Sequence, residues 1–435
     1  MTVSRQNTPD NVSDYLFESI IFESERLSTT QDIKPIVTDL EIYESLDIPY
    51  LTGRLVLVDN SNFIHNSDIL GGEKIIVNLR NTKLKSLKVT KTFYISQIVS
   101  TVKNDDHTEV AYFELLEDIG FISNLFNVNR FYNGFGSTII EKISKEYLEK
   151  EVEVITSDNS NMNLIVPNLE PIDAMLWIRN RLSTVEGYPF YLFSTLNGSK
   201  IALADLGTLL QLNPVNETPY RGFQGASVSD VGDNSERVLN GFKFERSENI
   251  YQIIHDGLIG AEYQYIDTLS GEKNKIDYDV VKDLLKPLIN SGVLGDQKNV
   301  LVTDQFNQKS RSISRIGGTN AFRLKNIFNL SYDENKLKSD YKRNIISHSM
   351  AEILQKAPLT VNVDGLDFIN ANSHFTIGNN LKIEFLNSLV DNEASNRIDM
   401  KKSGSYLIYS ARHMFKKERY DLVMTGVKMG NLKRL

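Results

Sequence analysis

Residues 72–81 read GEKIIVNLRN, and residues 378–387 read GNNLKIEFLN. Each stretch begins with a glycine, places apolar side chains at the third, fifth and seventh residues after it, and closes with an asparagine. Such alternation predicts a β-strand with one buried face. Because the two stretches lie in opposite halves of the chain, they indicate a duplicated β domain. The alternative is a chance match between two β-meanders, since β periodicity carries little information.

A hairpin follows each of these strands and supports the duplication. The separation from Tyr94 to Val110 equals that from Tyr406 to Leu422, and we expect these positions to correspond. Each interval contains a charged tip, and the second copy carries a longer polar insertion around residues 391–402. The tips are Asp105-Asp106 and Lys417-Glu418.

The chain up to residue 118 reads mostly as strand, because short β-branched and aromatic runs alternate with polar residues between turn signals. That number of strands is enough for one small antiparallel barrel, so residues 1–118 are predicted to form a first β-barrel domain. The expected strands are residues 16–22, 36–43, 55–58, 75–79, 93–99 and 110–115.

Residues 119–234 are predicted to form an α+β accessory domain. A helix is expected from Thr138, with Glu141 completing a capping box, and a second helix from Pro171 to about Leu182. A hairpin is expected to turn at Asn197-Gly198. Residues 211–234, rich in Pro, Gly, Asn and Ser, are expected to be a loop or boundary.

The remaining chain is predicted to complete a second, discontinuous barrel. Residues 235–270 are expected to supply strands, at 238–244 and 262–266, that pair with the closing β segment, residues 378–427, of a domain that spans residues 345–435. Residues 271–344 would form the second part of the accessory region. A helical stripe from Ile345 to Leu354 ends before Pro358, which cannot continue a helix. The expected fold class is therefore α+β and β-rich, with two antiparallel β-barrel domains and α+β accessory domains.

Composition narrows the possible functions. The 435 residues include no cysteine, which excludes disulfides, thiolate metal sites and cysteine nucleophiles. The net charge of -8 argues against tight nucleic-acid binding. No segment of the sequence has the pattern of a signal peptide or of a membrane-spanning helix. We therefore expect a soluble protein that is made in a cytoplasm.

No residue pattern predicts catalytic chemistry, a cofactor or a metal site. The phosphate-binding, dinucleotide-binding, nucleophile-elbow and EF-hand patterns are all incomplete. The scattered histidines are interpreted as surface or hydrogen-bonded residues, Trp177 as a core or domain-contact residue, and the basic clusters at 336–343 and 416–419 as solvated faces or hairpin tips. The chain is therefore expected not to be an enzyme. The six histidines are His65, His107, His255, His348, His374 and His413.

Four stretches resemble the opening of baseplate hub proteins from T-even-type contractile-tailed phages (myoviruses): residues 41–45 (EIYES), 48–53 (IPYLTG), 55–59 (LVLVD) and 71–73 (GGE). The later helix, hairpin and closing β segment follow in the same order, while residues 205–235 and 295–335 match poorly. The resemblance implies two tail-tube-like barrels in each subunit of a homotrimer. Six similar units would then form a pseudo-sixfold ring.

The resemblance also implies partners and a location. The expected partners are the central spike protein, the tail tube or tube-initiator protein, and the tape measure and baseplate wedge proteins. The ring would leave a neutral or acidic channel through which DNA passes without specific binding, in a virion assembled in the host cytoplasm. Two other hypotheses stay open: a tail-associated cell-wall hydrolase, because 56 acidic residues offer many carboxylate pairs, and a carbohydrate-binding β protein of the tail.

Overall fold

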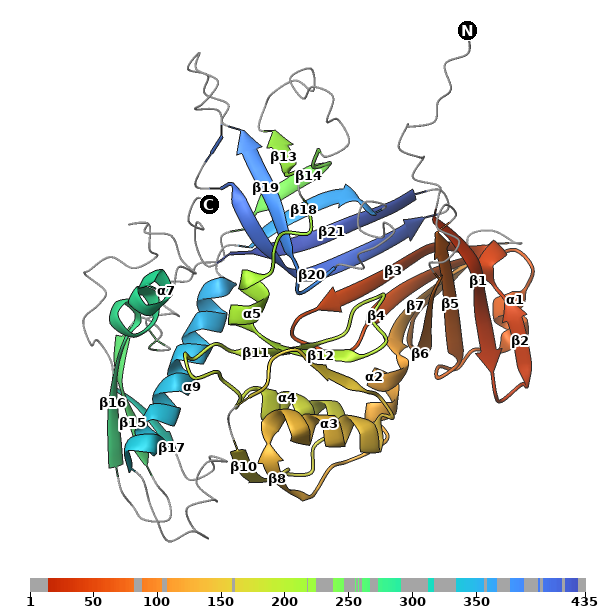
Figure 1. Cartoon of the computed structure of the whole chain (residues 1–435). Helices are drawn as coiled ribbons and strands as arrows, with labels where there is room; N and C mark the ends of the chain where they lie inside the picture. Colours follow the sequence, from red (N-terminus) through yellow and green to blue (C-terminus); the bar gives the residue numbers. More distant parts are fainter. Residues whose placement is uncertain are drawn as a thin grey trace, which may run out of the picture.

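The computed structural model shows a β-rich molecule in which helices lie beside a long, strongly curved sheet (Figure 1). It describes residues 15–81, 88–103, 108–158, 161–216, 218–223, 238–245, 255, 257, 260–266, 273–290, 312–316, 334–355, 358–365, 376–386, 398–399, 402–416 and 419–428.

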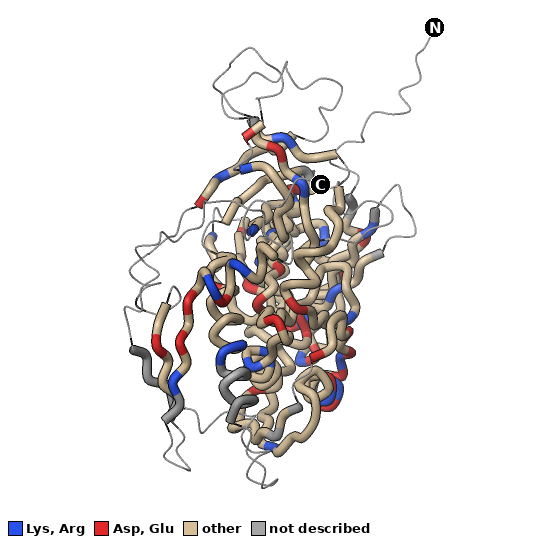
Figure 2. Tube along the Cα trace, turned by 60° about the vertical axis from the view of Figure 1, so that its left-hand side comes forward, with Lys and Arg blue, Asp and Glu red and all other residues tan. Residues whose placement is uncertain are grey.

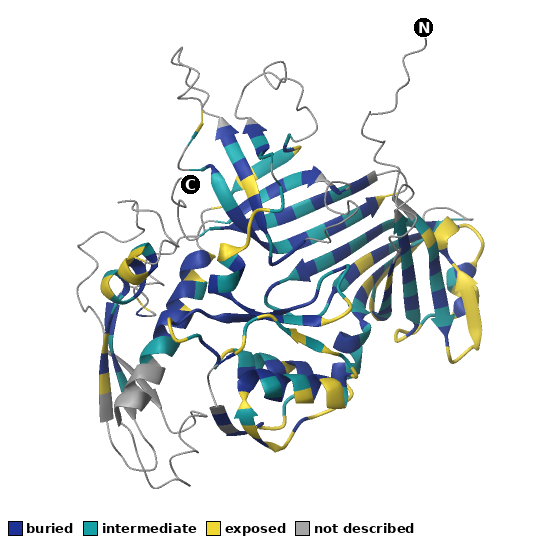
Figure 3. Ribbon diagram, in the orientation of Figure 1, coloured by how far each residue is buried: buried dark blue, intermediate teal, exposed yellow. Residues whose placement is uncertain are grey.

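The first β unit is formed by one continuous stretch of the chain. Its antiparallel strands lie in the order β3-β4-β7-β6-β5-β1-β2. Alternate side chains from β1 and β3 to β7 pack into one apolar core, so each strand is striped in Figure 3. The elements are β1 Tyr15–Ser24, β2 Thr29–Asp32, the 3-10 helix η2 Lys34–Ile36, β3 Val37–Ser45, β4 Thr52–Asp59, α1 Phe63–Ser67, β5 Lys74–Asn81, β6 Lys88–Lys103 and β7 Glu109–Glu117.

The second β unit gathers strands from three separate parts of the chain. Its order is β13-β19-β20-β21-β18-β14. The expected pairing of residues 238–244 with residues 378–427 is only partly right: β14 joins the sheet of these closing strands, but its direct partner is β18, which precedes them in the chain. The interval expected to be a loop contains β13, which pairs parallel with β19. The strands are β13 Tyr220–Phe223, β14 Gly241–Phe244, β18 Leu359–Asp364, β19 Asn380–Leu386, β20 Gly404–Lys416 and β21 Arg419–Val427.

The prediction for residues 262–266 is wrong. β15 (Gly260–Ile266) does not join the second β unit but lies between β16 (Lys273–Asp279) and β17 (Ser312–Ile316). The alternation of Ala261 and Tyr263 correctly indicated a strand, but a strand pattern does not specify its neighbours. The domain boundaries predicted at residues 118, 234, 270 and 344 stay predictions.

The two β units have the same strand order. The sequence β1-β5-β6-β7-β4-β3 corresponds to β13-β19-β20-β21-β18-β14. The order that a duplication requires is therefore present. One difference lies at the edge, where β1 runs antiparallel to β5 whereas β13 runs parallel to β19.

The turn glycines fix which residues correspond. The Gly72 amide donates to the Ile95 carbonyl at 2.8 Å, and the Gly378 amide donates to the Ile408 carbonyl at 3.0 Å. A bulge follows each acceptor in β6 and β20. Ile95 therefore corresponds to Ile408, and the predicted match of Tyr94 with Tyr406 is wrong by one residue. β6 has a second bulge, after Ile98, that β20 lacks, so equal spacing along the two sequences does not give equal places in the ladders.

The same ladder relates the neighbouring strands. Leu115 faces Ile95 in the first unit, as Gly426 faces Ile408 in the second. Gly53 then faces Leu115, as Leu359 faces Gly426. These equivalent positions give a residue-by-residue alignment of the two units.

The accessory unit packs helices against two small sheets beneath the junction of the β units (Figure 1). The predicted helix from Pro171 and the hairpin are confirmed, but Thr138 does not cap its helix. Instead, the buried Asp158 carboxylate accepts from the amides of Gly136 and Ser137. The elements are α2 Asp118–Ser123, β8 Phe131–Phe135, α3 Gly136–Tyr147, β9 Val152–Val154, β10 Asn161–Ile165, α4 Pro171–Arg179, β11 Phe190–Phe193, β12 Ile201–Asp205 and α5 Leu206–Gln211.

A long helix joins the second β unit to the three-stranded sheet of β16, β15 and β17, which we call the outer sheet. α9 (Glu334–Leu354) contains the predicted stripe, and Met350 and Leu354 are buried in the same core as β18 to β21. The π-helix η5 (Val280–Leu285) and α7 (Lys286–Asn290) follow β16 and contribute Leu284 and Leu288 to this core. Figure 2 shows acidic and basic residues interspersed along the described chain.

Candidate functional site: the junction between the two β units

The two β units are joined by backbone hydrogen bonds rather than by side chains alone. β20 is long enough to serve both units: its first residues pair with β19, and residues 410–416 pair antiparallel with β3. Among the described residues, this contact makes one thirteen-stranded sheet. Adding a strand across an edge satisfies backbone donors and acceptors that would otherwise face water. The relative position of the two units is therefore fixed by strand register.

A buried polar cluster lies on this shared ladder. His413 of β20 and Glu44 of β3 are almost fully buried, with Nε2 of the ring 3.3 Å from the Glu44 Oε1. The other ring nitrogen of His413 lies 2.7 Å from the Tyr420 hydroxyl. The Leu196 amide of the accessory hairpin loop donates to Glu44. One cluster thus connects both β units and the accessory unit.

The Glu44 carboxyl is held in its ionised form. Burial raises its pKa, but His413, the Thr376 hydroxyl and the Leu196 amide together bring the pKa below its ordinary value. A general acid requires the opposite shift, because it must carry a proton near neutral pH. The cluster is therefore suited to holding strands together and not to acid catalysis.

A buried ion pair ties the first β unit to the same hairpin. Lys91 Nζ lies 3.0 Å from the Glu117 carboxylate and donates to the Gly198 carbonyl at 2.9 Å. Glu117 also accepts from the Leu51 amide at 2.8 Å. Burying an ion pair stabilises a protein little unless its remaining hydrogen-bonding groups also have partners. The bonds to the Gly198 carbonyl and from the Leu51 amide provide such partners. The predicted Asn197-Gly198 turn is thus an anchor on β6.

A third polar group lies where the second β unit meets the helices. The Tyr409 hydroxyl donates to Asp47 at 2.7 Å and accepts from the Gln355 amide at 2.5 Å. Burial first, and then the neighbouring Tyr191 and Asp47, raise the pKa of Tyr409. Tyr409 therefore remains a neutral hydrogen-bond donor, which links β20 to the loop after β3.

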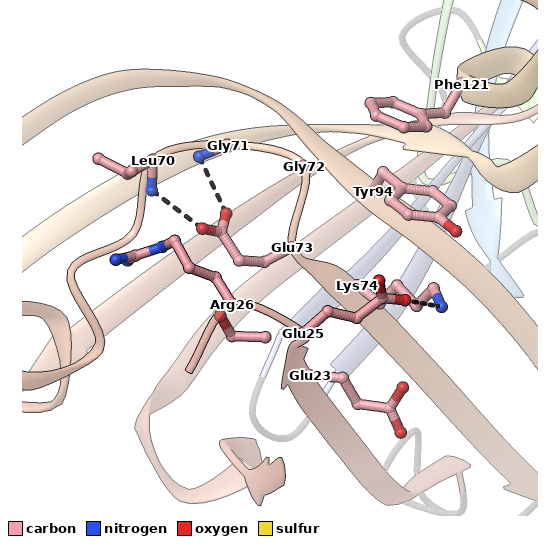
Figure 4. A pocket seen from close by; sticks show the side chains of 11 residues that line it. Glu23, Glu25, Arg26, Leu70, Gly71, Gly72, Glu73, Lys74, Tyr94 and Phe121 are labelled. Carbon is pink, nitrogen blue, oxygen red and sulfur yellow. Dashed lines mark hydrogen bonds and ion pairs between the residues drawn. The ribbon is translucent and has the colours of Figure 1, made fainter. Parts of the chain in front are cut away.

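A pocket of about 330 Å³ opens at the rim of the first β unit (Figure 4). Two of its carboxylates are already engaged: Glu73 accepts from the amides of Leu70 and Gly71, and Glu25 pairs with Lys74 at 2.9 Å. Lys74 lowers the pKa of Glu25, which is the wrong direction for a general acid. The lining residues are Glu23, Ser24, Glu25, Arg26, Leu70, Gly71, Gly72, Glu73, Lys74, Tyr94 and Phe121.

The sequence predicted no catalytic, cofactor-binding or metal-binding residue. The searched part of the chain contains no group of three His, Cys, Asp or Glu residues arranged to hold a metal ion. Among the histidines, His65, His255 and His348 are exposed and His413 is buried, while His107 and His374 lie outside the described residues. Trp177 is half-buried against the accessory core, with the Arg181 guanidinium 3.7 Å from its ring centre.

Sequence reasoning missed the junction residues. Glu44 and Lys91 look like ordinary polar positions of alternating strands, and His413 lies in a charged stretch. One signal was present: the unbroken apolar run at residues 406–409 is unusual for a half-exposed strand and is typical of one buried on both faces. No helix that was searched has both the length and the apolar character needed to cross a bilayer.

Comparison with known proteins indicates the fold. No protein-family model and no curated protein matches the chain. Among solved structures, the 43 kDa tail protein of prophage MuSo2 from Shewanella oneidensis is similar over 96% of this chain and 100% of its own, with 11% identity and a TM-score of 0.54. The chain thus has the fold of a phage tail protein. The expected fold class, β-rich α+β with tail-tube-like β units, is confirmed.

Two further structures are similar over most of their length. The alignment with the tail protein from Neisseria meningitidis MC58 covers 96% of this chain and 98% of that protein, with 11% identity and a TM-score of 0.49. The E. coli c3393 protein, described as a component of the type VI secretion system, covers 92% of this chain and 76% of its own, with 12% identity and a TM-score of 0.42.

Proposed function

We propose that the chain is a structural baseplate hub subunit of a contractile phage tail. Three copies would form a ring of six similar β units that links the tail tube to the central spike. The observation that carries this proposal is the pair of β units with one strand order, joined edge to edge through β3 and β20. A duplicated unit gives a physical reason for the arrangement, since a trimer with two units per chain presents six similar faces to a hexameric tube.

The partners follow from the two faces of such a ring. The face with sixfold pseudosymmetry would contact the tail tube or tube-initiator protein, and the threefold face, formed by the accessory units, would contact the spike. Tape measure and baseplate wedge proteins are further partners. Three-dimensional similarity to a prophage tail protein supports a location in the virion tail, after assembly in the host cytoplasm.

The ring would enclose a channel for DNA. A net charge of -8 supports a channel wall that is neutral or acidic. Such a wall would not retain a passing polyanion.

The function we propose is non-enzymatic. The polar groups of the junction hold one another, and the carboxylates that carry lowered pKa values are the reverse of a general acid. A zymogram on peptidoglycan tests the hydrolase alternative. Clear lysis by the purified protein would replace the structural proposal with that of a tail-associated hydrolase.

The assembly is tested by the native mass of the purified protein. The expected result is a particle with three times the 49.4 kDa of one chain, and electron microscopy should show a ring. A chain that stays monomeric at concentrations where its tail partners assemble would contradict the proposal that it is a hub subunit.

A further inference from the structure

The contact between β3 and β20 inside one chain is a template for a contact between chains. In this contact Ile42 faces His413 and Glu41 faces Met414 on antiparallel strands. We call β3 the donating edge, because it is the strand that is added, and residues 410–416 of β20 the accepting edge. Because the two β units are equivalent strand by strand, each unit has one edge of each kind. The chain uses one edge of each kind internally.

The remaining accepting edge is the end of β6. Residues 88–94 of β6 pair with β5, whereas residues 97–103 pair only with β7 in the described structure. Val99 and Val102 on this segment are 46% and 51% exposed. Residues 410–416 of β20, which occupy the equivalent place, alternate between buried and half-buried up to the exposed Lys416, because β3 covers them.

The remaining donating edge is β14. It corresponds to β3, since β14 flanks β18 as β3 flanks β4. Within the described residues β14 forms the outer end of the thirteen-stranded sheet. An unpaired strand edge presents backbone donors and acceptors that can pair with another chain, so these two complementary edges can meet between copies.

The register of the missing contact follows from the alignment of the two units. Leu115 of the first unit is equivalent to Gly426 of the second, so the residues four positions earlier, Ala111 and Leu422, are also equivalent. Ala111 faces Thr101 on β6, and Leu422 faces His413 on β20. Thr101 therefore corresponds to His413, and Val102 to Met414.

The donating strand aligns in the same way. Phe244 faces Leu359, as Ile42 faces Gly53, so Phe244 corresponds to Ile42. Lys243 then corresponds to Glu41, because the next residues along both ladders also match.

We propose that β14 of one copy adds as an antiparallel strand to residues 97–103 of β6 in the next copy, with Phe244 opposite Thr101 and Lys243 opposite Val102. This inference rests on the proposed trimer and names the strands that close it. The contact is heterologous, and a rotation of roughly 60 degrees per β unit closes such a chain of contacts after six units, which is three copies.

The test uses the absence of cysteine, which leaves no background of native thiols. Val102→Cys and Lys243→Cys are made as two separate proteins and as one double variant. Directly opposed positions bring Cβ atoms to about 4.5–5.5 Å, close to what a disulfide requires. After mild oxidation, the double variant should run as covalent dimer and trimer, and a mixture of the two single variants should give a linked dimer.

Two matched controls define the geometry. Glu41→Cys with Met414→Cys occupies the equivalent contact within one chain, so it should link without any increase in mass. Gln97→Cys with Lys243→Cys displaces one partner along the same strand, and it should link at most one-tenth as much as the proposed pair.

The native mass of each oxidised sample separates the two hypotheses. A trimer in which the proposed pair does not link, or links no better than the displaced pair, would overturn the strand pairing and leave the hub function standing. A monomer that does not link would overturn both. Linking of the double variant within one chain would overturn the pairing as well.

Discussion

The two β units share one strand order, but the chain supplies their strands in different ways. The first unit is contiguous from β1 to β7, and its core takes in only Leu196, Phe415 and Tyr420 from the rest of the described chain. The second takes β13, β14 and β18 to β21 from separate segments, and its core continues into α9 and the outer sheet. The strand order and the order of the strands along the chain are therefore the same in both units, but long insertions separate the strands of the second unit. The pattern of edges and buried faces determines a tube-like unit more strongly than chain continuity does.

The largest expected difference between the units concerns the buried ion pair. In the aligned second unit, Gly404 and Lys428 occupy the places of Lys91 and Glu117, so only the first unit contains this pair. Lys91→Met should reduce the free energy of unfolding by about 3–5 kcal/mol, because it leaves the Glu117 charge buried without its cation. Urea denaturation followed by circular dichroism measures this loss.

The double variant Lys91→Met with Glu117→Leu is the control. It removes both charges and should recover most of the lost stability. A double variant as unstable as the single one would mean that packing around Lys91, rather than the charge of Glu117, determines the effect.

The second expected effect compares the two turn glycines. Both have positive φ, +85° at Gly72 and +80° at Gly378, so alanine strains either turn by about 1–2 kcal/mol. A Cβ at Gly378 would lie 2.8 Å from the Phe193 ring, whereas at Gly72 its nearest neighbour, Phe121, is 3.9 Å away. Gly378→Ala should therefore cost about 1–3 kcal/mol more than Gly72→Ala in urea denaturation.

Combining Gly378→Ala with Phe193→Leu sharpens this comparison. The smaller side chain removes the ring that the new methyl group would meet, so the effect of the glycine substitution should fall toward that of Gly72→Ala. Equal losses for the two single variants would show that the accessory hairpin does not constrain the second turn.

The third expected effect is a pH dependence confined to the second unit. Burial lowers the pKa of Lys428 from 10.5 to about 8. Between those two pH values the unfolded chain binds more protons than the folded one at this residue, so its contribution to stability rises with pH. Lys428→Met should remove this rise and increase stability at pH 7 by about 1–2 kcal/mol. Thermal unfolding from pH 7 to 10 measures it, and parallel curves for both proteins would contradict it.

The smallest expected effect concerns the ion pair on β14. Lys243 and Glu245 are 2.8 Å apart but mostly exposed. Lys243→Ala should change the free energy of unfolding of one chain by no more than about 0.5 kcal/mol, because water and salt screen such pairs. A loss above about 1 kcal/mol in the isolated chain would show that β14 depends on its side chains and would weaken Lys243 as a cross-linking position.

The sequence predicted most of the local structure. The first six strands, the helix from Pro171, the hairpin and the Ile345 to Leu354 stripe all appear, because buried faces leave a regular pattern of apolar residues. Errors arose where a single residue changes the register or the cap: a second bulge in β6, absent from β20, shifted the expected hairpin alignment, and Asp158 replaced Thr138 as the helix cap. Bulges and distant caps leave no periodic signal.

The sequence by itself determined the strands that follow Gly72 and Gly378 and indicated a duplicated β unit, because both glycines precede the same alternation and a turn glycine needs positive φ wherever that turn is used. Only the tertiary structure decided which strand edges meet. Hydrogen bonding between strands uses backbone groups that every residue carries, so β3 and β20 bear no mark of their pairing in sequence. The burial of Glu44 beside His413 likewise depends on that contact. Partner choice among edges is a property of the assembled sheet, and for that reason the strand at residues 262–266 was recognised as a strand but assigned to the wrong sheet.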